Sequence, residues 1–147
     1  MTQYDLVIFG ATGFTGQWVA REFHEFSADF KWAICGRSED RLVDVIKKHY
    51  LTTDYLVADV NDAESLNAVC RKTKLLVNCT GPYRLLGESI FKSCVQNGTD
   101  YLDICGEPEF IEAMEMKVSL TSFLNRCSAV QYFSSHMLFS TARIISF

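Results

Sequence analysis

The fold is decided by the stretch DLVIFGATGFTG, residues 5–16, in which an apolar run passes directly into a turn with three glycines. The apolar run is typical of a buried parallel strand. After the turn, Val19, Phe23 and Phe26 recur at helical spacing and predict a helix over 14–26. A strand, a glycine turn and a helix in this order are typical of the start of an α/β domain.

The same alternation of strand and helix signals continues along the chain. Strands are expected at 31–35, 54–58, 75–79 and 101–104, with helices after Ser38 and Asn61, over about 85–97, and from Pro108. Ser38 is a predicted N-cap, Asn61 with Glu64 resembles a capping box, and Gly98 is expected to end its helix in a left-handed conformation. Five strands alternating with helices predict an α/β fold, a doubly wound, Rossmann-like parallel sheet with strand order 3-2-1-4-5.

Each glycine of the turn has a physical reason to be there. Gly10 permits a tight turn out of the strand, Gly13 lets the backbone approach a pyrophosphate, and Gly16 lets the helix pack closely on the sheet. The turn predicts a dinucleotide site at the helix N-terminus, although its spacing is one residue off the G-x-G-x-x-G fingerprint. A turn that serves packing alone is the alternative. The residues expected to hold the pyrophosphate are Gly10, Thr12, Gly13, Phe14, Thr15 and Gly16.

The end of the second strand indicates which dinucleotide is bound. An NAD site usually has an acidic residue there, which holds the ribose 2′-hydroxyl. This chain has Arg37 and Ser38 instead, and a guanidinium with a hydroxyl suits a 2′-phosphate. NADP(H) is therefore favoured over NAD(H); the alternative is that Arg37 only covers the surface.

Two further strand ends face the same predicted crevice. Asp59 and Val60 follow the third strand and are candidates to flank the adenine, whereas Thr80, Gly81, Pro82 and Tyr83 follow the fourth and are candidates for the nicotinamide-side ribose. Each group is equally compatible with an ordinary turn. The acidic residues around the end of the fifth strand also allow two interpretations. They are either polar groups of the crevice or the solvated start of the next helix: Asp103, Glu107 and Glu109.

No catalytic acid, base or metal site is identified in the sequence. None of the tyrosines is followed four residues later by a lysine, which is the spacing of short-chain dehydrogenases. His24, His49 and His136 have no serine or carboxylate partner at a diagnostic spacing. The six cysteines show no zinc or redox spacing, so buried, reduced thiols are expected.

Length and composition limit the function classes. A chain of 147 residues with 48% apolar residues is long enough for one domain with a real core. A formal net charge of −4 argues against a general nucleic-acid binder. No apolar run approaches the length needed to span a bilayer, and no secretory signal opens the chain.

The charge distribution changes at Lys117. Residues 1–117 hold all 18 acidic residues and 12 of the 14 basic ones, whereas residues 118–147 carry only Arg126 and Arg143. We therefore expect an NAD(P)-binding Rossmann domain over 1–117 and a divergent tail over 118–147.

Four blocks carry a resemblance to a known family: Gly10-Ala-Thr-Gly-Phe-Thr-Gly16, Gly36-Arg-Ser38, Asn78-Cys-Thr-Gly-Pro-Tyr83 and Tyr101-Leu-Asp-Ile-Cys-Gly-Glu-Pro108. In this order and on these elements, they make residues 4–117 resemble the N-terminal NADP-binding domain of the saccharopine dehydrogenase-like oxidoreductases. The resemblance implies NADP as cofactor and a sheet that is incomplete relative to the family. It leaves the substrate undefined.

The resemblance also implies properties of the longer relatives. These carry a second domain for dimerisation and substrate binding, form homodimers, and associate with lipid droplets, mitochondria or other membranes at the cytoplasmic face. Fungal relatives have a lipid-linked reductase role. A chain without the substrate domain is expected to be inactive alone. The alternative is a non-catalytic dinucleotide-binding or redox-sensing module, or an inactive truncated product.

The family pattern continues the helix at Lys117 into another strand with its own glycine turn, whereas residues 118–147 show none of that pattern. Lys117-Val-Ser119 is compatible with reading through a splice donor, so the tail is hypothesised to be a retained intron or alternative 3′ end. The competing interpretation is a genuine divergent tail.

Overall fold

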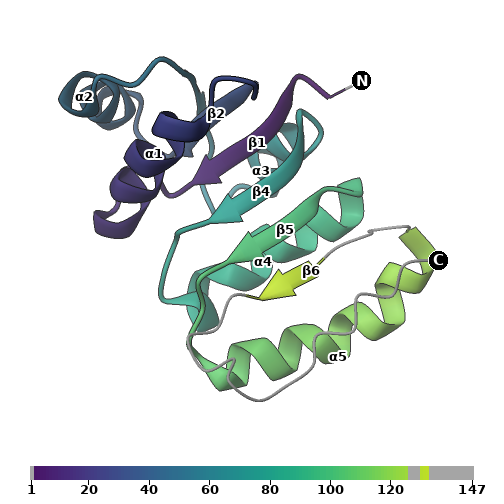
Figure 1. Ribbon diagram of the computed structural model, residues 1–147. Helices are drawn as coiled ribbons and strands as arrows, with labels where there is room; N and C mark the ends of the chain where they lie inside the picture. Colours follow the sequence, from purple (N-terminus) through teal and green to yellow (C-terminus); the bar gives the residue numbers. More distant parts are fainter. Residues whose placement is uncertain (1, 126–129, 133–147) are drawn as a thin grey trace.

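The computed structural model describes residues 2–125 and 130–132. These residues form one parallel sheet in the order β3-β2-β1-β4-β5-β6 (Figure 1). Its strands are β1 (Tyr4–Phe9), β2 (Trp32–Gly36), β3 (Asp54–Val57), β4 (Thr73–Asn78), β5 (Asp100–Asp103) and β6 (Val130–Tyr132). The helices are α1 (Phe14–Phe26), α2 (Glu39–His49), α3 (Ala63–Cys70), α4 (Tyr83–Asn97) and α5 (Pro108–Asn125). The predicted Rossmann-like sheet and its order 3-2-1-4-5 are confirmed, and β6 extends it.

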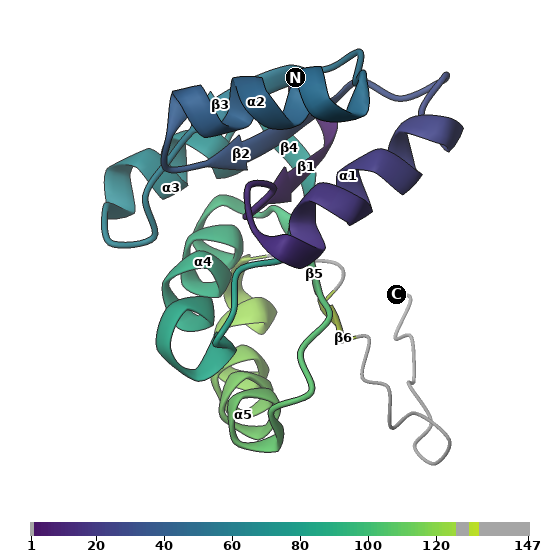
Figure 2. The same cartoon turned by 90° about the vertical axis from the view of Figure 1, so that its left-hand side faces the viewer.

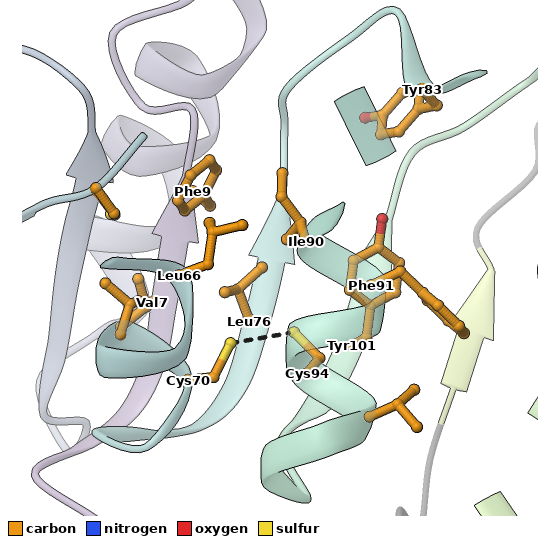
Figure 3. Packing of buried hydrophobic residues seen from close by; sticks show 14 of the residues in the cluster. Val7, Phe9, Leu66, Cys70, Leu76, Tyr83, Ile90, Phe91, Cys94 and Tyr101 are labelled. Atoms are coloured by element: carbon orange, nitrogen blue, oxygen red, sulfur yellow. Dashed lines mark hydrogen bonds between the residues drawn. The ribbon is translucent and has the colours of Figure 1, made fainter. Parts of the chain in front are cut away.

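Two hydrophobic cores cover the two faces of the sheet. Side chains alternate along β1, so that Val7 and Phe9 enter one core and Ile8 enters the other. The first core lies under α3, α4 and α5 and includes Leu66 and Ile90 (Figure 3). The second core lies under α1 and α2. Figure 2 shows α3, α4 and α5 on one side of the sheet and α1 on the other.

The helix ends agree with the sequence in some places and correct it in others. Gly98 ends α4 at a φ of 66°, as predicted. Ser38 precedes α2, but its side chain makes no capping hydrogen bond. The predicted capping box at Asn61 is wrong, because Asp62 is the N-cap of α3 and its carboxylate accepts from the backbone N–H groups of Glu64 and Ser65. An aspartate one residue later offers the same helix start a charged acceptor.

The chain keeps regular structure beyond Lys117. Helix α5 continues to Asn125, and β6 pairs in parallel with β5, placing Val130 opposite Tyr101. The family pattern of a continued helix and a further strand was not recognised in the sequence after Lys117. The helix can continue because 118–125 contains no glycine or proline to end it. The hypothesis of a read-through origin stays a prediction, and residues 133–147 lie outside the described part.

The cysteines are buried as expected. Of the five described ones, Cys35, Cys70, Cys94 and Cys105 are buried and Cys79 is half-buried; Cys127 is outside the described residues. The sulfurs of Cys70 and Cys94 lie 3.7 Å apart between α3 and α4 (Figure 3). Among the residues the structure describes, no group of three His, Cys, Asp or Glu could hold a metal ion, and no helix is long and apolar enough to cross a membrane.

Candidate dinucleotide-binding site

The glycine turn connects β1 to α1 at the carboxyl edge of the sheet. Gly10 has a φ of 82°, a conformation that favours glycine, and its N–H donates to the carbonyl of Cys35 at the end of β2, at 2.9 Å. A Cβ on Gly16 would lie 2.2 Å from the carbonyl oxygen of Gly10. The helix therefore starts directly against the turn, as the sequence predicted for a close helix–strand approach.

The N-terminus of α1 is open to an anion. Its N-cap is Gly13, no side chain caps it, and the first turn holds no acidic residue. By contrast, α3 is capped by Asp62, and the first N–H groups of α4 donate to the carboxylate of Glu107. A helix N-terminus carries unpaired N–H groups and partial positive charge. At α1 these are left without an acidic partner, beside the exposed Phe14 and Thr15.

The segment after β4 lies beside this turn (Figure 2). A Cβ on Gly10 would meet the hydroxyl oxygen of Thr80 at 2.4 Å, so the two backbones approach as closely as glycine allows. The Thr80 hydroxyl oxygen is buried and has no hydrogen-bond partner. Next to it, Gly81 and Pro82 are exposed. An unpartnered hydroxyl at this position leaves an acceptor and a donor for a ligand lying across the turn.

Two arginines follow β2, one directly after the strand and one in α2. Arg37 is exposed and Ser38 is half-buried, both at the carboxyl end of the sheet. Arg41, in the first turn of α2, donates to the carbonyl oxygen of Thr12 at 3.1 Å. The sequence interpretation missed Arg41. A signal was present, since a cation in the first turn of a helix opposes the helix dipole and calls for another reason.

Asp59 and Val60 follow β3 but are used within their own turn. The Asp59 carboxylate accepts from the backbone N–H of Asn61 at 2.8 Å and from its side-chain amide at 3.1 Å. Val60 packs against the first core. Both residues lie at the carboxyl edge, and the described contacts are those of a turn leading into α3.

A buried polar network lies under the segment after β4. Asn78 donates to the hydroxyl of Tyr101 at 3.0 Å, and that hydroxyl donates to the carboxylate of Asp103 at 2.8 Å. Burial raises the pKa of Asp103 and of Tyr101. Asp103, which the sequence left open as a crevice group, is thus a fully buried part of the core.

Tyr83 also points into the protein. Its hydroxyl donates to the backbone carbonyl of Asn78 at 3.0 Å, and burial raises its pKa well above the ordinary value. Figure 3 shows the ring above the core residues Ile90 and Phe91. The side chain of Tyr83 is therefore turned toward the core and away from the predicted cofactor crevice.

The acidic residues after β5 and the histidines separate into different roles. Glu109 is exposed, whereas Glu107 is half-buried and accepts hydrogen bonds from α4. His49 contacts Gln17, with 3.2 Å between its Nε2 and the amide oxygen, and His24 packs near Trp32. His136 lies outside the described residues. Gln17 in turn donates to the carbonyl oxygen of Gly13, at 3.3 Å, so His49 is linked to the glycine turn through one side chain.

A dinucleotide fits the residues present. The open start of α1 suits a pyrophosphate, and the unpartnered Thr80 hydroxyl suits a ribose or phosphate oxygen. Arg37 follows β2, and Arg41 lies against the carbonyl oxygen of Thr12 in the turn. A shallow cavity of about 880 Å³ lies at the opposite, amino end of the strands, against Tyr4, Trp32 and Asp54. It contains none of the predicted site residues, and sheets of this type bind ligands at the carboxyl ends of their strands.

Comparison with known proteins decides the family. The family model described as the saccharopine dehydrogenase NADP binding domain matches residues 6–132. The chain belongs to this family. The matched residues include α5 and β6, which lie past the domain boundary expected at residue 117.

The curated relatives that this chain matches are longer than the chain itself. A saccharopine dehydrogenase-like oxidoreductase from Rattus norvegicus is 40% identical over 129 residues, covering 78% of this chain and 30% of the relative. A lipid droplet localized protein from Caenorhabditis elegans is 40% identical, covering 81% of this chain and 30% of the relative. A probable mitochondrial saccharopine dehydrogenase-like oxidoreductase from Arabidopsis thaliana is 42% identical over 124 residues, covering 76% of this chain and 27% of the relative. The chain thus spans about a third or less of these relatives.

Comparison with a solved structure confirms the fold of this chain. Apo saccharopine dehydrogenase (L-Glu forming) from Saccharomyces cerevisiae superimposes with a TM-score of 0.60 at 15% identity, covering 74% of this chain and 23% of that one. At this identity the likeness concerns the fold alone.

Proposed function

We propose that this domain binds NADP(H) across the glycine turn and presents it for hydride transfer in a saccharopine dehydrogenase-like oxidoreductase. The observation that carries the proposal is the uncapped N-terminus of α1, together with the unpartnered Thr80 hydroxyl beside Gly10 in the turn that leads to it. The pyrophosphate would lie on the N–H groups of residues 14–16, where charge and unpaired donors favour it, since the N–H of Gly13 already donates to the carbonyl oxygen of Gly10 at 3.0 Å. Thr80, Gly81 and Pro82 would contact the nicotinamide-side ribose.

The preference for NADP(H) over NAD(H) rests on the charges at the end of β2. Arg37 and Ser38 would hold the 2′-phosphate, with Arg41 close by on α2. No carboxylate stands at residues 36–38 to accept from a ribose hydroxyl. Glu39 follows, but its carboxylate accepts from the hydroxyl of Tyr55 at 2.6 Å.

The cofactor supplies the hydride chemistry, and the residues of this chain bind and orient it. Asp59 and Val60 would flank the adenine. We propose a lipid-related substrate, supported by the lipid droplet name of the C. elegans relative. Association with lipid droplets or mitochondria is proposed on the same footing, from the names of two relatives. Homodimers of the full-length protein, and association with other membranes, are proposed from the family resemblance alone.

A second candidate is a non-catalytic dinucleotide-binding or redox-sensing module. It is supported by the sequence, in which no catalytic acid or base stands at a diagnostic spacing. Tight NADPH binding without turnover in a reductase screen distinguishes this module from an enzyme.

The test of the proposal is a fluorescence titration of NADPH and NADH with the chain and with Arg37→Ala. Loss of a charge-assisted contact to phosphate is expected to weaken NADPH binding roughly tenfold and to leave NADH binding unchanged. Arg71→Ala is the control, because Arg71 pairs with Glu64 just before β4, at the other end of the sheet. Equal weakening of both nucleotides by Arg37→Ala would contradict the assignment.

A further inference from the structure

The first N–H groups of α4 are held by a carboxylate from another part of the chain. The Glu107 carboxylate accepts from the backbone N–H of Tyr83 at 2.8 Å and from that of Arg84 at 2.9 Å, one oxygen to each. The N-cap residue is Pro82, which has no side chain able to do this. The segment between β5 and α5 therefore fixes the start of α4.

The loop between β4 and α4, residues 79–82, is also fixed at its other end, where it leaves β4. The backbone N–H of Thr80 donates to the side-chain oxygen of Asn78 at 2.9 Å, and that of Cys79 donates to the carbonyl of Phe9 at 2.9 Å. Between the two fixed ends lies Gly81, which is exposed and where an added Cβ would meet only the Tyr83 ring, at 3.9 Å. A short backbone segment is thus held rigidly, with open space above it, beside the glycine turn.

Glu107 is itself held in position. Its N–H donates to the sulfur of Cys105 at 3.2 Å, and its carbonyl accepts from the N–H groups of Phe110 and Ile111 at the start of α5. The Phe110 ring packs on Gly87 of α4, where a Cβ would meet the ring at 2.7 Å. The close approach of α4 and α5 therefore sets the place of the carboxylate.

We infer that Glu107 is a positioning residue for the nicotinamide half of the bound cofactor: by fixing the start of α4, it holds the segment 80–82 in its cofactor-facing shape. The same carboxylate occupies the N-terminal donors of α4, so that the pyrophosphate is directed to α1. The inference rests on the proposed function, because it assigns the segment 80–82 to the nicotinamide side.

The experiment uses two probes, NADPH and 2′-phospho-ADP, which keeps the adenine half and the pyrophosphate but lacks the nicotinamide and its ribose. Glu107→Ala is expected to raise the Kd of NADPH roughly tenfold, from the loss of two charge-assisted hydrogen bonds that preorganise the loop, and to change that of 2′-phospho-ADP less than about twofold. Glu107→Gln keeps the size and one acceptor and is expected to fall between. Glu109→Gln is the matched control, an exposed acidic residue two positions along.

Backbone amide exchange gives a readout that does not depend on a nucleotide. In Glu107→Ala and Glu107→Gln, the amides of Tyr83 and Arg84 should exchange faster while those of Ile8 and Val77 in the central strands stay protected. Equal weakening of both probes, or no weakening of either, overturns the inference. If the unaltered chain binds 2′-phospho-ADP but not NADPH, the inference is wrong and the adenine half of the proposal stands. Failure to bind either probe removes the proposed function itself.

Discussion

Replacing Gly16 by alanine tests the contact between the glycine turn and α1. The new Cβ would lie 2.2 Å from the Gly10 carbonyl oxygen, 2.8 Å from its carbon and 2.9 Å from the Cα of Ala11. Ordinary contact begins at 3.4 Å, and all three neighbours are backbone atoms that cannot rotate away. The start of α1 must therefore shift by about 1 Å or the turn must open.

Two opposing effects set the magnitude. Alanine in a helix is more favourable than glycine by roughly 0.5–1 kcal/mol. Overpacking of a rigid contact costs about 1–3 kcal/mol and sometimes more, and a clash with backbone belongs at the upper end. A net loss of about 2 kcal/mol is expected, which lowers the urea midpoint by about 1 M at a slope of roughly 2 kcal/mol/M.

The assay is urea unfolding followed by circular dichroism. Gly106→Ala is the control, because a Cβ there meets nothing within 4 Å, and its midpoint should stay within about 0.3 M of the unaltered chain. A Gly16→Ala chain as stable as the unaltered one would refute the argument that this glycine is required by backbone contact.

Three further outcomes are expected. Asp62→Ala should cost about 1 kcal/mol in urea unfolding through loss of the α3 cap, whereas Asn61→Ala should cost clearly less; equal costs would contradict the cap assignment. Burial raises the pKa of Asp103 in the folded state, so its contribution to stability is full below the ordinary value of 3.8 and is lost as pH rises through the raised pKa. Asp103→Asn should therefore show a smaller loss of unfolding free energy between pH 4 and 6, and an unchanged pH dependence would count against it. Burial raises the pKa of Cys35 to about 12, so this thiol should resist Ellman's reagent at pH 8 until the protein unfolds, and rapid labelling in the native state would contradict its burial.

The fold could be predicted because each buried strand is a continuous apolar run ended by a turn signal. The run before Gly10 is buried between helices on both faces, which is the environment such a run indicates. The cap at Asp62 was misplaced by one residue because adjacent Asn and Asp both suit an N-cap, and only backbone geometry separates them. The strand β6 was missed because it is three residues long and no glycine turn precedes it.

The site was predicted less completely, because contacts between distant segments leave little trace in local patterns. The glycine turn could be predicted from the spacing of its glycines, and Thr80 could be predicted as a site residue because it follows the end of a strand. The partnership of Glu107 with the start of α4 depends on how α4 and α5 pack, and no local pattern distinguishes Glu107 from Glu109. Burial of Asp103 likewise depends on its partners Tyr101 and Cys105.

The central claim is that NADP(H) binds at the open N-terminus of α1, and calorimetric titration of the unaltered chain with NADPH and NADH tests it most directly. One site per chain is predicted, with NADPH bound at least about tenfold more tightly than NADH because of the guanidinium groups at the end of β2. Binding of neither nucleotide, or tighter binding of NADH, would contradict the claim.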